Sequence, residues 1–554
     1  MRPNILSPRA SDPPEAGPSA ARVRLLVSAW LVLTCHGPLL RALLRDRPLD
    51  DLSTWGFLAA CALALLAIQG LLLSLLAPGP LLRPMATVLL VVGAGATHFM
   101  ETFGAYLDPS MLRNAMRTDV GEARELLSLG MAWRLLWQAG LPAALLWRRP
   151  VRRRPFGPAL RGWLLGVGGA LVLMVGAVMA VFQPMASLMR QHKEVRYLVT
   201  PANVLWSSAS VLAGDLRGAA RPREPIGLDA APGPRLAART RPLVVVMVVG
   251  ETVRAANWGL SGYARPTTPE LARLGPAVIS FPRVTSCGTN TEVSLPCMFA
   301  PVGRRDHDES RIRGSQSLLH VMRRAGVDVL WRDNQSGCKG VCEGLPAEEM
   351  AALNPPGLCA DGRCLDEALL HGLDAKLDAA RGTGMIVLHM LGNHGPSYFR
   401  RYPPAFERHV PACRQDDLRQ CSVAEIVNAY DNAILYTDHL LATLIGRLQA
   451  RQDRTDSVLL YVSDHGESLG EANLFLHGLP WAIAPDVQKQ VPMVMWFSAG
   501  APAATGVDPD CLRRRAAQPA EHDHLFHTLL ALTDVRTALH DPAWDLTQGC
   551  RRDR

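Results

Sequence analysis

The hydrophobic positions of this chain crowd into its first 185 residues, where they form five long apolar stretches. A segment that crosses a lipid bilayer needs about 20 apolar residues. The second and fifth stretches reach that length without a charge, and polar residues do not alternate with the runs as a soluble core helix would require. We therefore predict five membrane spans, at Leu25–Leu40, Trp55–Leu82, Met85–Met100, Leu126–Trp147 and Gly162–Met185.

Basic residues predict how these spans are oriented. Arg22 and Arg24 precede the first span, and six arginines between positions 148 and 161 separate the fourth from the fifth. Short loops rich in Lys and Arg stay in the cytoplasm. Five spans then place everything after Met185 outside. The proline- and charge-rich segment 1–24 fits poorly with a cleaved signal peptide.

The pattern divides the chain into three parts. We expect a five-helix transmembrane domain over residues 1–185, with a polar outward loop over 101–125. Scattered apolar positions over 186–213 predict a helix lying on the membrane surface, and a Pro-, Gly-, Ala- and Arg-rich linker follows, so that 186–241 connects the domains. Residues 242–554 form the outer domain.

Short apolar runs and helical stretches alternate through the outer domain. This alternation predicts an α/β domain whose parallel sheet is covered on both faces. The expected buried strands are Leu243–Val249, Val327–Trp331, Met385–His389, Ser457–Ser463 and Val491–Phe497. The expected helices are Ser317–Ala325, Asp366–Ala380 and Ala424–Ala450.

Composition narrows the class of protein. Hydrophobic residues make up 48% of the chain, which excludes disorder over most of it, and charged residues only 19%. The formal net charge of +8 comes almost entirely from arginine, because lysine occurs only at positions 193, 339, 376 and 489. Arginine bias of this kind often reflects genome composition, so we expect no nucleic-acid partner.

Cysteine usage is an independent indication of an exported domain. Ten of the twelve cysteines lie after residue 280, and most are close neighbours. An even number of clustered cysteines in an exported domain favours disulfides. Zinc binding by cysteine is the competing interpretation, and the absence of any CxxC pair weakens it. Local pairing gives Cys287 with Cys297, Cys338 with Cys342, Cys359 with Cys364 and Cys413 with Cys421; the remaining pair, Cys511 and Cys550, has the least support.

Residues that could bind a metal or take part in catalysis directly follow the expected strands. Glu251 follows the first strand, and Asp464 and His465 follow the fourth. Ligands of parallel sheets bind beyond the carboxyl ends of the strands. One imidazole and two carboxylates are an acceptable ligand set for a catalytic zinc, although Asp and His at such a position also serve as helix caps.

A candidate nucleophile lies in the sequence SCGTNTEVSLPC, at Thr291. A threonine hydroxyl is a poor nucleophile until a metal or a base activates it. A helix N-cap or a turn is the alternative role for a threonine here.

Long, ordered motifs across the outer domain resemble those of the lipid A phosphoethanolamine transferases, a family that includes chromosomal enzymes and mobile colistin-resistance enzymes. The resemblance implies a membrane α-helical N-terminal domain of five spans plus an α/β alkaline-phosphatase-like, sulfatase-type periplasmic domain, in the bacterial inner membrane. The motifs are GETVRAANWGLSGYARPTTPEL, SCGTNTEVSLPCMF, WRDNQSGCKGVC, HMLGNHGPSYFRRYP, VNAYDNAILYTD, SDHGESLGEANLFLHGLPWAIAP and HDHLFHTLLAL.

The same resemblance implies roles for individual residues. Zinc is bound by Glu251, Thr291, Asp464 and His465, and Thr291 carries the phosphoethanolamine group. Lys339, His394, Glu467 and His477 fall on substrate-binding or proton-handling positions. The family's Asn-Asn pair near the lysine is Asn334-Gln335 here, which leaves a glutamine in a head-group contact.

The outward loop carries a further pattern. Asn114, Thr118 and Glu122 are spaced by four and share one face if the segment is a helix that begins at Asp108-Pro109-Ser110. A solvated helix face is the ordinary interpretation. A similar Asn, Thr and Glu pattern in the family favours contacts with a phosphatidylethanolamine head group.

These features predict a two-step reaction. Thr291 takes phosphoethanolamine from phosphatidylethanolamine, and a phosphate of lipid A then accepts it, which masks anionic charge and weakens binding of polymyxin. The alternatives are another acceptor, such as core heptose or periplasmic glucan, and a membrane-anchored phosphodiesterase or sulfatase-like hydrolase. A receptor with an inactive fold is a third alternative, against which the complete ligand set argues.

Overall fold

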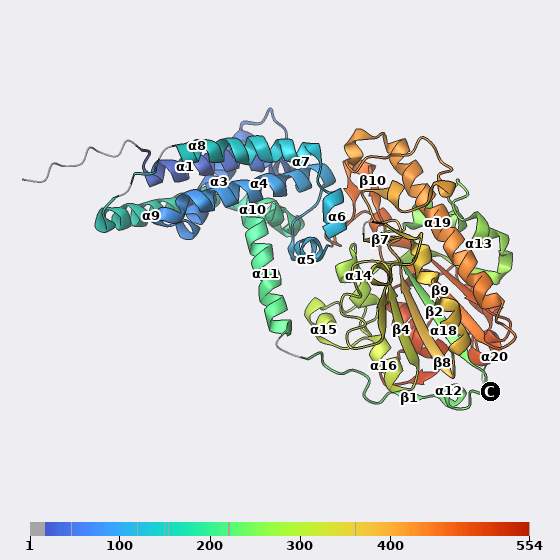
Figure 1. Ribbon diagram of the computed structural model, residues 1–554. Coiled ribbons are helices and arrows are strands. Elements are labelled where there is room, and N and C mark those ends of the chain that lie inside the picture. Colours follow the sequence, from blue (N-terminus) through green and yellow to red (C-terminus); the bar gives the residue numbers. More distant parts are fainter. Residues whose placement is uncertain are drawn as a thin grey trace, which may run out of the picture. The chain divides into compact units, whose positions relative to one another are not determined.

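The computed structural model describes residues 17–552 except 46, 119, 149, 153, 220–221 and 361. The side chains of 120–122, 187, 190–191 and 217–219 also lie outside the described part, and Glu122 is among them. The chain forms two compact units, shown in Figure 1. The helical unit comprises Met1–Glu101 and Leu129–Trp206, and the sheet unit comprises Thr102–Ser128 and Ser207–Arg554.

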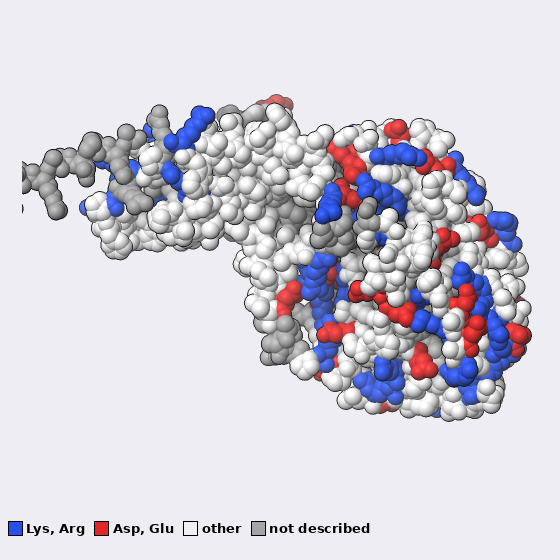
Figure 2. Space-filling model, in the orientation of Figure 1, with Lys and Arg blue, Asp and Glu red and all other residues white. Residues whose placement is uncertain are grey.

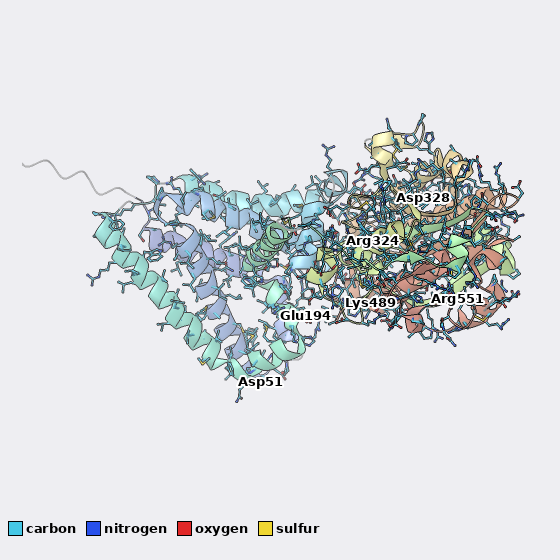
Figure 3. All side chains as sticks on the ribbon, turned by 90° about the horizontal axis from the view of Figure 1, so that it is seen from below. Asp51, Glu194, Arg324, Asp328, Lys489 and Arg551 are labelled. Carbon is cyan, nitrogen blue, oxygen red and sulfur yellow. A yellow bond between two sulfur atoms is a disulfide. The ribbon has the colours of Figure 1, made fainter. Side chains whose placement is uncertain are left out.

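The helical unit consists of long apolar helices. Its visible face in Figure 2 is mostly uncharged, whereas the sheet unit carries interspersed acidic and basic side chains. Asp51 caps α3 by accepting a hydrogen bond from the amide of Ser53 (Figure 3). The helices are α1 (Ala20–Cys35), α2 (Gly37–Leu44), α3 (Leu52–Leu76), α4 (Leu82–Phe103), α7 (Leu129–Arg134), α8 (Leu141–Arg148), α9 (Phe156–Ala180) and α10 (Phe182–Gln191). The boundary between the units falls inside α11 (Ala202–Ala219).

Three helices of the described chain are long and apolar enough to cross a membrane, or four if the bent pair α1 and α2 is one span. The pair bends by 60° at His36, where Pro38 follows at the start of α2. The structure therefore gives three or four candidate spans where the sequence predicts five. The expected fourth span is divided into α7, a π-helical turn at Leu135–Gly140 and α8, which follow one another without a gap.

Arg134, the charge inside that divided stretch, is paired. Its guanidinium lies 2.6 Å from the Glu101 carboxylate on α4. A charged side chain within an apolar helix bundle normally has such a partner. The expected surface helix over 186–213 is wrong as a single helix, because a 3₁₀ turn (Lys193–Leu198) and Pro201 separate α10 from α11. Proline cannot continue a helix through its interior.

The sheet unit is built on an eight-stranded sheet of order β13-β3-β12-β9-β2-β8-β4-β5. The strands β2, β4, β8 and β9 are parallel to their mutual neighbours, as predicted. Their bounds are β2 (Leu243–Gly250), β3 (Val278–Thr285), β4 (Asp328–Asp333), β5 (Ala347–Glu349), β8 (Thr383–His389), β9 (Asp456–Ser463), β12 (Gln490–Phe497) and β13 (Ala520–Glu521).

One expected strand runs the other way, and three strands of the sheet, β3, β5 and β13, were not expected. The prediction that 491–497 is parallel is wrong, because β12 pairs antiparallel with both β9 and β3. A continuous apolar run reports burial on both faces, not strand direction. The sequence of β3 mixes buried and exposed positions and includes Pro282, which hides its strand character.

The side chains of β2 alternate between two hydrophobic cores, one on each face of the sheet. Val245 and Met247 pack on one face with α16 (Leu318–Arg324) and α22 (Asp523–Thr533), and Val244 and Val246 pack on the other with α19 (Val423–Gln449). Such period-two alternation fixes the register of the central strand. Capping boxes at Ser317 and Ser422 start α16 and α19. The expected helix 366–380 is broken into a 3₁₀ turn (Asp366–Leu370) and α18 (Leu373–Ala379), because Gly372 adopts a left-handed conformation.

The sheet unit contains five disulfides, all between cysteines after residue 280. They join Cys287 to Cys297, Cys338 to Cys342, Cys359 to Cys364, Cys413 to Cys421, and Cys511 to Cys550. The two remaining cysteines, Cys35 and Cys61, are free and buried in the helical unit.

The segment 102–128 belongs to the sheet unit, although it lies between two helices of the other unit in sequence. Asp108 caps α5 (Pro109–Arg117) by accepting from the Met111 amide at 2.8 Å. The expectation of one helix through position 122 is wrong. Thr118 is extended, ends α5 and donates its hydroxyl to the Asn114 carbonyl, and α6 (Val120–Glu125) starts afresh. A threonine hydroxyl competes with helical hydrogen bonds in this way.

Candidate active site

Two neighbouring strands, β2 and β9, deliver the first three candidate ligands. Gly250 is opposite Ser463 in the parallel register, so the residues that follow each strand, Glu251 and Asp464, meet at one edge of the sheet. The Asp464 amide donates to the Gly250 carbonyl at 2.9 Å, which ties the two turns together. All three side chains, Glu251, Asp464 and His465, are fully buried.

The candidate nucleophile is held at a helix N-terminus. Asn290 is the cap of α14 (Thr291–Met298), and its side chain accepts from the Val293 amide at 3.0 Å. Thr291 is therefore the first helical residue, not the cap. Amides of the first turn and the helix dipole favour negative charge on its oxygen or on a phosphate nearby. The tight turn before it requires Gly288, where a Cβ would lie 2.7 Å from the Ser294 amide nitrogen.

These groups converge on one point. The Thr291 hydroxyl oxygen lies 3.0 Å from Glu251 Oε2 and 3.4 Å from His465 Nε2. His465 Nε2 lies 3.3 Å from Glu251 Oε1 and 3.4 Å from Asp464 Oδ2. Thr252, at a φ of 61°, braces Glu251 Oε1 with its hydroxyl at 2.7 Å. A positive φ at a β-branched residue is rare, and such strain is concentrated at functional sites.

The donor set fits a divalent cation. Asp464 Oδ2 is buried without a hydrogen-bond partner among the described residues, and it faces a second buried carboxylate. Two buried carboxylates together are costly unless a cation compensates them. Three oxygens and one imidazole nitrogen suit zinc. His477 is also close, because one donor atom each of Glu251, His465 and His477 lie within 4.8 Å of one another.

The two carboxylates of the site, Glu251 and Asp464, lie around the imidazole of His465 and shift its pKa. Burial by itself would raise the pKa of Glu251, but the hydrogen bond and charge of His465 lower it well below its usual range. Burial and the charge of Glu251 raise the pKa of Asp464 to about 7. Burial would lower the pKa of His465, yet Asp464 and Glu251 raise it to about 10. The pocket therefore favours positive charge at its centre.

A second group of ionisable residues lies beside this centre. His477 Nδ1 lies 3.3 Å from Glu467 Oε1, and the Tyr398 hydroxyl donates to Glu467 Oε2 at 3.0 Å. Burial raises the pKa of Glu467 to about 8 and lowers the pKa of His477 to about 3. At neutral pH the carboxyl group is therefore protonated and the imidazole is neutral. The ring of His394 packs edge-on to His477, with centroids 5.7 Å apart.

Lys339 lies near the candidate nucleophile, Thr291, because it faces Glu292, a residue that the sequence did not single out. Its ammonium donates to Ser336 and lies 3.5 Å from the carboxylate of Glu292, the residue after Thr291. Gln335 lies nearer the ligands, with Nε2 3.5 Å from Glu251 Oε2. Asn334 instead donates to Asp366 at 2.8 Å and holds the loop. A carboxylate in the first turn of the nucleophile helix was the only available signal for Glu292.

Two further residues, His522 and Tyr398, support the site and were not singled out in the sequence. His522 Nδ1 accepts from the Cys287 amide at 3.0 Å, and its Nε2 lies 3.0 Å from the Ser463 carbonyl oxygen. This histidine joins the nucleophile loop to the end of β9. Tyr398, which holds Glu467, had no distinguishing feature in the sequence.

Comparison with known proteins places these residues in a family. The model of the sulfatase family matches residues 244–535, and that of the family described as phosphoethanolamine transferase EptA/EptB matches residues 65–216. Phosphoethanolamine transferase EptA of Salmonella typhimurium is 39% identical over 95% of this chain and 96% of its own length. The chain belongs to the phosphoethanolamine transferase family.

Other members of the family agree in sequence and structure. Phosphatidylethanolamine transferase Mcr-1 of Escherichia coli is 35% identical over 92% of this chain and 94% of its own. The structure of the integral membrane lipooligosaccharide phosphoethanolamine transferase A from Neisseria meningitidis superposes with a TM-score of 0.91 at 34% identity. It covers 98% of this chain and 100% of its own. The likeness thus extends over both units of this transferase.

Proposed function

We propose that this protein transfers phosphoethanolamine from phosphatidylethanolamine to a phosphate of lipid A through a phosphoethanolamine-threonine intermediate. One observation carries the proposal: the Thr291 hydroxyl lies at a helix N-terminus, 3.0 Å from Glu251 within a buried set of metal-type donors. Membership of the family and the names of its members support the reaction class.

In the first step the Thr291 oxygen attacks the phosphorus of the donor. The Oγ–P bond forms as the hydroxyl proton passes to the Glu251 carboxylate that accepts its hydrogen bond. The P–O bond to glycerol breaks, and diacylglycerol leaves with a proton from a second group. His477 and Glu467 hold one proton between them beside the centre, so the Glu467 carboxyl group is a suitable acid for this departure. The amides at the start of α14 stabilise charge on the phosphoryl oxygens.

In the second step a phosphate oxygen of the acceptor attacks the same phosphorus. The bond to Thr291 breaks, and the threonine oxygen regains its proton from the Glu251 carboxyl group. We assign the metal to Glu251, Thr291, Asp464 and His465 and identify it as zinc. When bound, zinc supplies a Lewis acid and lowers the pKa of the coordinated hydroxyl. Lys339 and His394 border the centre and would bind the phosphodiester and move protons, respectively.

The membrane arrangement follows from the same proposal. We infer five spans in the bacterial inner membrane, with residues 1–185 as the membrane domain, 186–241 as the connection and 242–554 as the catalytic domain in the periplasm. The uninterrupted run from α7 to α8 and the pairing of Arg134 with Glu101 support the fourth span. Asn114 and Thr118 are half-buried on the catalytic side, where a lipid head group would arrive. With Glu122, they are our candidates for its contacts.

Mass spectrometry tests the proposal directly. Lipid A from cells that express the protein should gain the mass of phosphoethanolamine, and the cells should survive more polymyxin, because the added amine offsets phosphate charge. Intact-protein mass should show the same adduct on the wild type and none on Thr291→Ala. Unmodified lipid A alongside modified heptose or glucan would reassign the acceptor, and an adduct on Thr289 would reassign the nucleophile.

A further inference from the structure

The segment 102–128 is joined to the catalytic centre by a buried ion pair. Glu125, the last residue of α6, has a side chain only 2% exposed, and its carboxylate Oε2 lies 2.7 Å from Arg401 Nη2. Arg363 contacts the other carboxylate oxygen. The Arg401 side chain is 1% exposed. A guanidinium this deep in the protein needs a carboxylate partner, and segment 102–128 supplies it.

The same guanidinium holds the main chain at His394. Arg401 Nε donates to the His394 carbonyl at 2.6 Å, while Nη2 donates to Glu125. Arginine has five donors in a fixed fork, so one plane serves both acceptors at once. The position of the His394 carbonyl is thereby coupled to the position of Glu125. His394 in turn packs on His477, which packs on His465 with ring centroids 4.3 Å apart.

We propose that Glu125 is a positioning residue of the transfer reaction: through Arg401 it sets the main chain at His394, so the catalytic centre is complete only when segment 102–128 is seated. The inference rests on the proposed function. It explains why a segment between two membrane helices belongs to the sheet unit. It also implies that a fragment beginning near residue 215 lacks a part of the catalytic centre.

The test compares full-length variants with two donors, phosphatidylethanolamine in detergent micelles and soluble p-nitrophenyl phosphoethanolamine. Glu125→Gln keeps the side-chain shape and removes the charge. We expect kcat to fall about ten- to a hundredfold with both donors, the scale of a small misplacement, while KM changes less than twofold. Glu125→Asp, which keeps the charge, should recover part of the loss.

Arg401→Lys is the second variant, in case Glu125→Gln folds poorly. One ammonium on a flexible stem cannot reproduce the fork between Glu125 and the His394 carbonyl, so kcat should fall similarly while the thermal midpoint stays near that of the wild type. Arg400→Lys is the matched control, because Arg400 is half-exposed and pairs with Asp416 at the surface. Its kinetics should equal those of the wild type.

The outcomes separate the two proposals. A wild type inactive with both donors overturns the proposed function and, with it, this inference. An active wild type whose kcat is unchanged in Glu125→Gln and Arg401→Lys overturns the inference alone. A rise in KM for the lipid with unchanged kcat also overturns it, because Glu125 would then only dock the segment.

Discussion

The carboxylate of Glu292 lies 3.1 Å from the guanidinium of Arg117, although 175 residues separate them. Glu292 follows the candidate nucleophile and is fully buried, and Arg117 ends α5. Arg313 contacts the same carboxylate at 3.0 Å, and Lys339 lies 3.5 Å away. One buried negative charge thus holds three cations beside Thr291, and one of them comes from segment 102–128.

Removing that charge should destabilise the protein. In Glu292→Gln the Lys339 ammonium, whose side chain is 5% exposed, loses its carboxylate partner, and Arg313 keeps only Glu309. Breaking a buried ion pair costs about 3–5 kcal/mol. Glu343→Gln is the control, because the Glu343 side chain is 65% exposed and pairs with Arg223 at the surface. Its loss should be about 1 kcal/mol or less. Thermal unfolding in detergent measures both, and equal shifts of the midpoint would contradict the role of burial.

Asp464 should control metal content. Asp464→Asn weakens a charged ligand, and we expect bound zinc and transfer activity to fall together. Asp456→Asn is the control at the opposite end of β9, where the carboxylate pairs with Arg241 at 3.1 Å. Elemental analysis of the purified variants measures the metal. Full zinc occupancy in an inactive Asp464→Asn variant would show that the carboxylate is not needed for metal binding, and would contradict the assignment of Asp464 as a zinc ligand.

The features that could be predicted from the sequence are mainly the buried strands and the functional residues that directly follow them. The run 243–249 is apolar at every position and could only be a buried strand, so the residues that follow it could be placed. Contacts made by arginine across 175 or 276 residues leave no local pattern, which is why Glu292 and the Glu125–Arg401 pair were not found. The direction of β12 could not be predicted either, because an apolar run looks the same whether the strand is parallel or antiparallel to its neighbours.

Asp438 should give the stability a pH dependence. Its carboxylate accepts from the amides of Glu270 and Leu271, but burial outweighs these bonds and raises the pKa to about 7. The native state then binds a proton that the unfolded chain releases near its usual value of 3.8. The contribution is full below that value and is lost as the pH rises towards 7.

Asp438→Asn isolates this effect. The amide keeps one acceptor and never ionises, so the variant should lose about 1 kcal/mol at acidic pH and change less than the wild type between pH 4 and 7. Chemical unfolding at several pH values measures the difference. Parallel curves for the two proteins would show that Asp438 does not titrate in this interval.

The disulfides should separate stability from activity. Cys511 and Cys550 are 39 residues apart, whereas Cys338 and Cys342 are four apart. Loop entropy gives the long closure about 4 kcal/mol and the short one about 2. In the native state the Asp508 amide still donates to the Cys550 carbonyl, so replacing Cys511 and Cys550 by serine acts mainly on the unfolded chain.

The short disulfide, Cys338–Cys342, encloses Lys339, whose ammonium faces Glu292 beside the candidate nucleophile. Its double serine variant should therefore lose less stability and more activity than the 511–550 variant. Thermal unfolding and transfer assays on both proteins decide this, and the same order in the two measurements would contradict a catalytic role for the Lys339 loop.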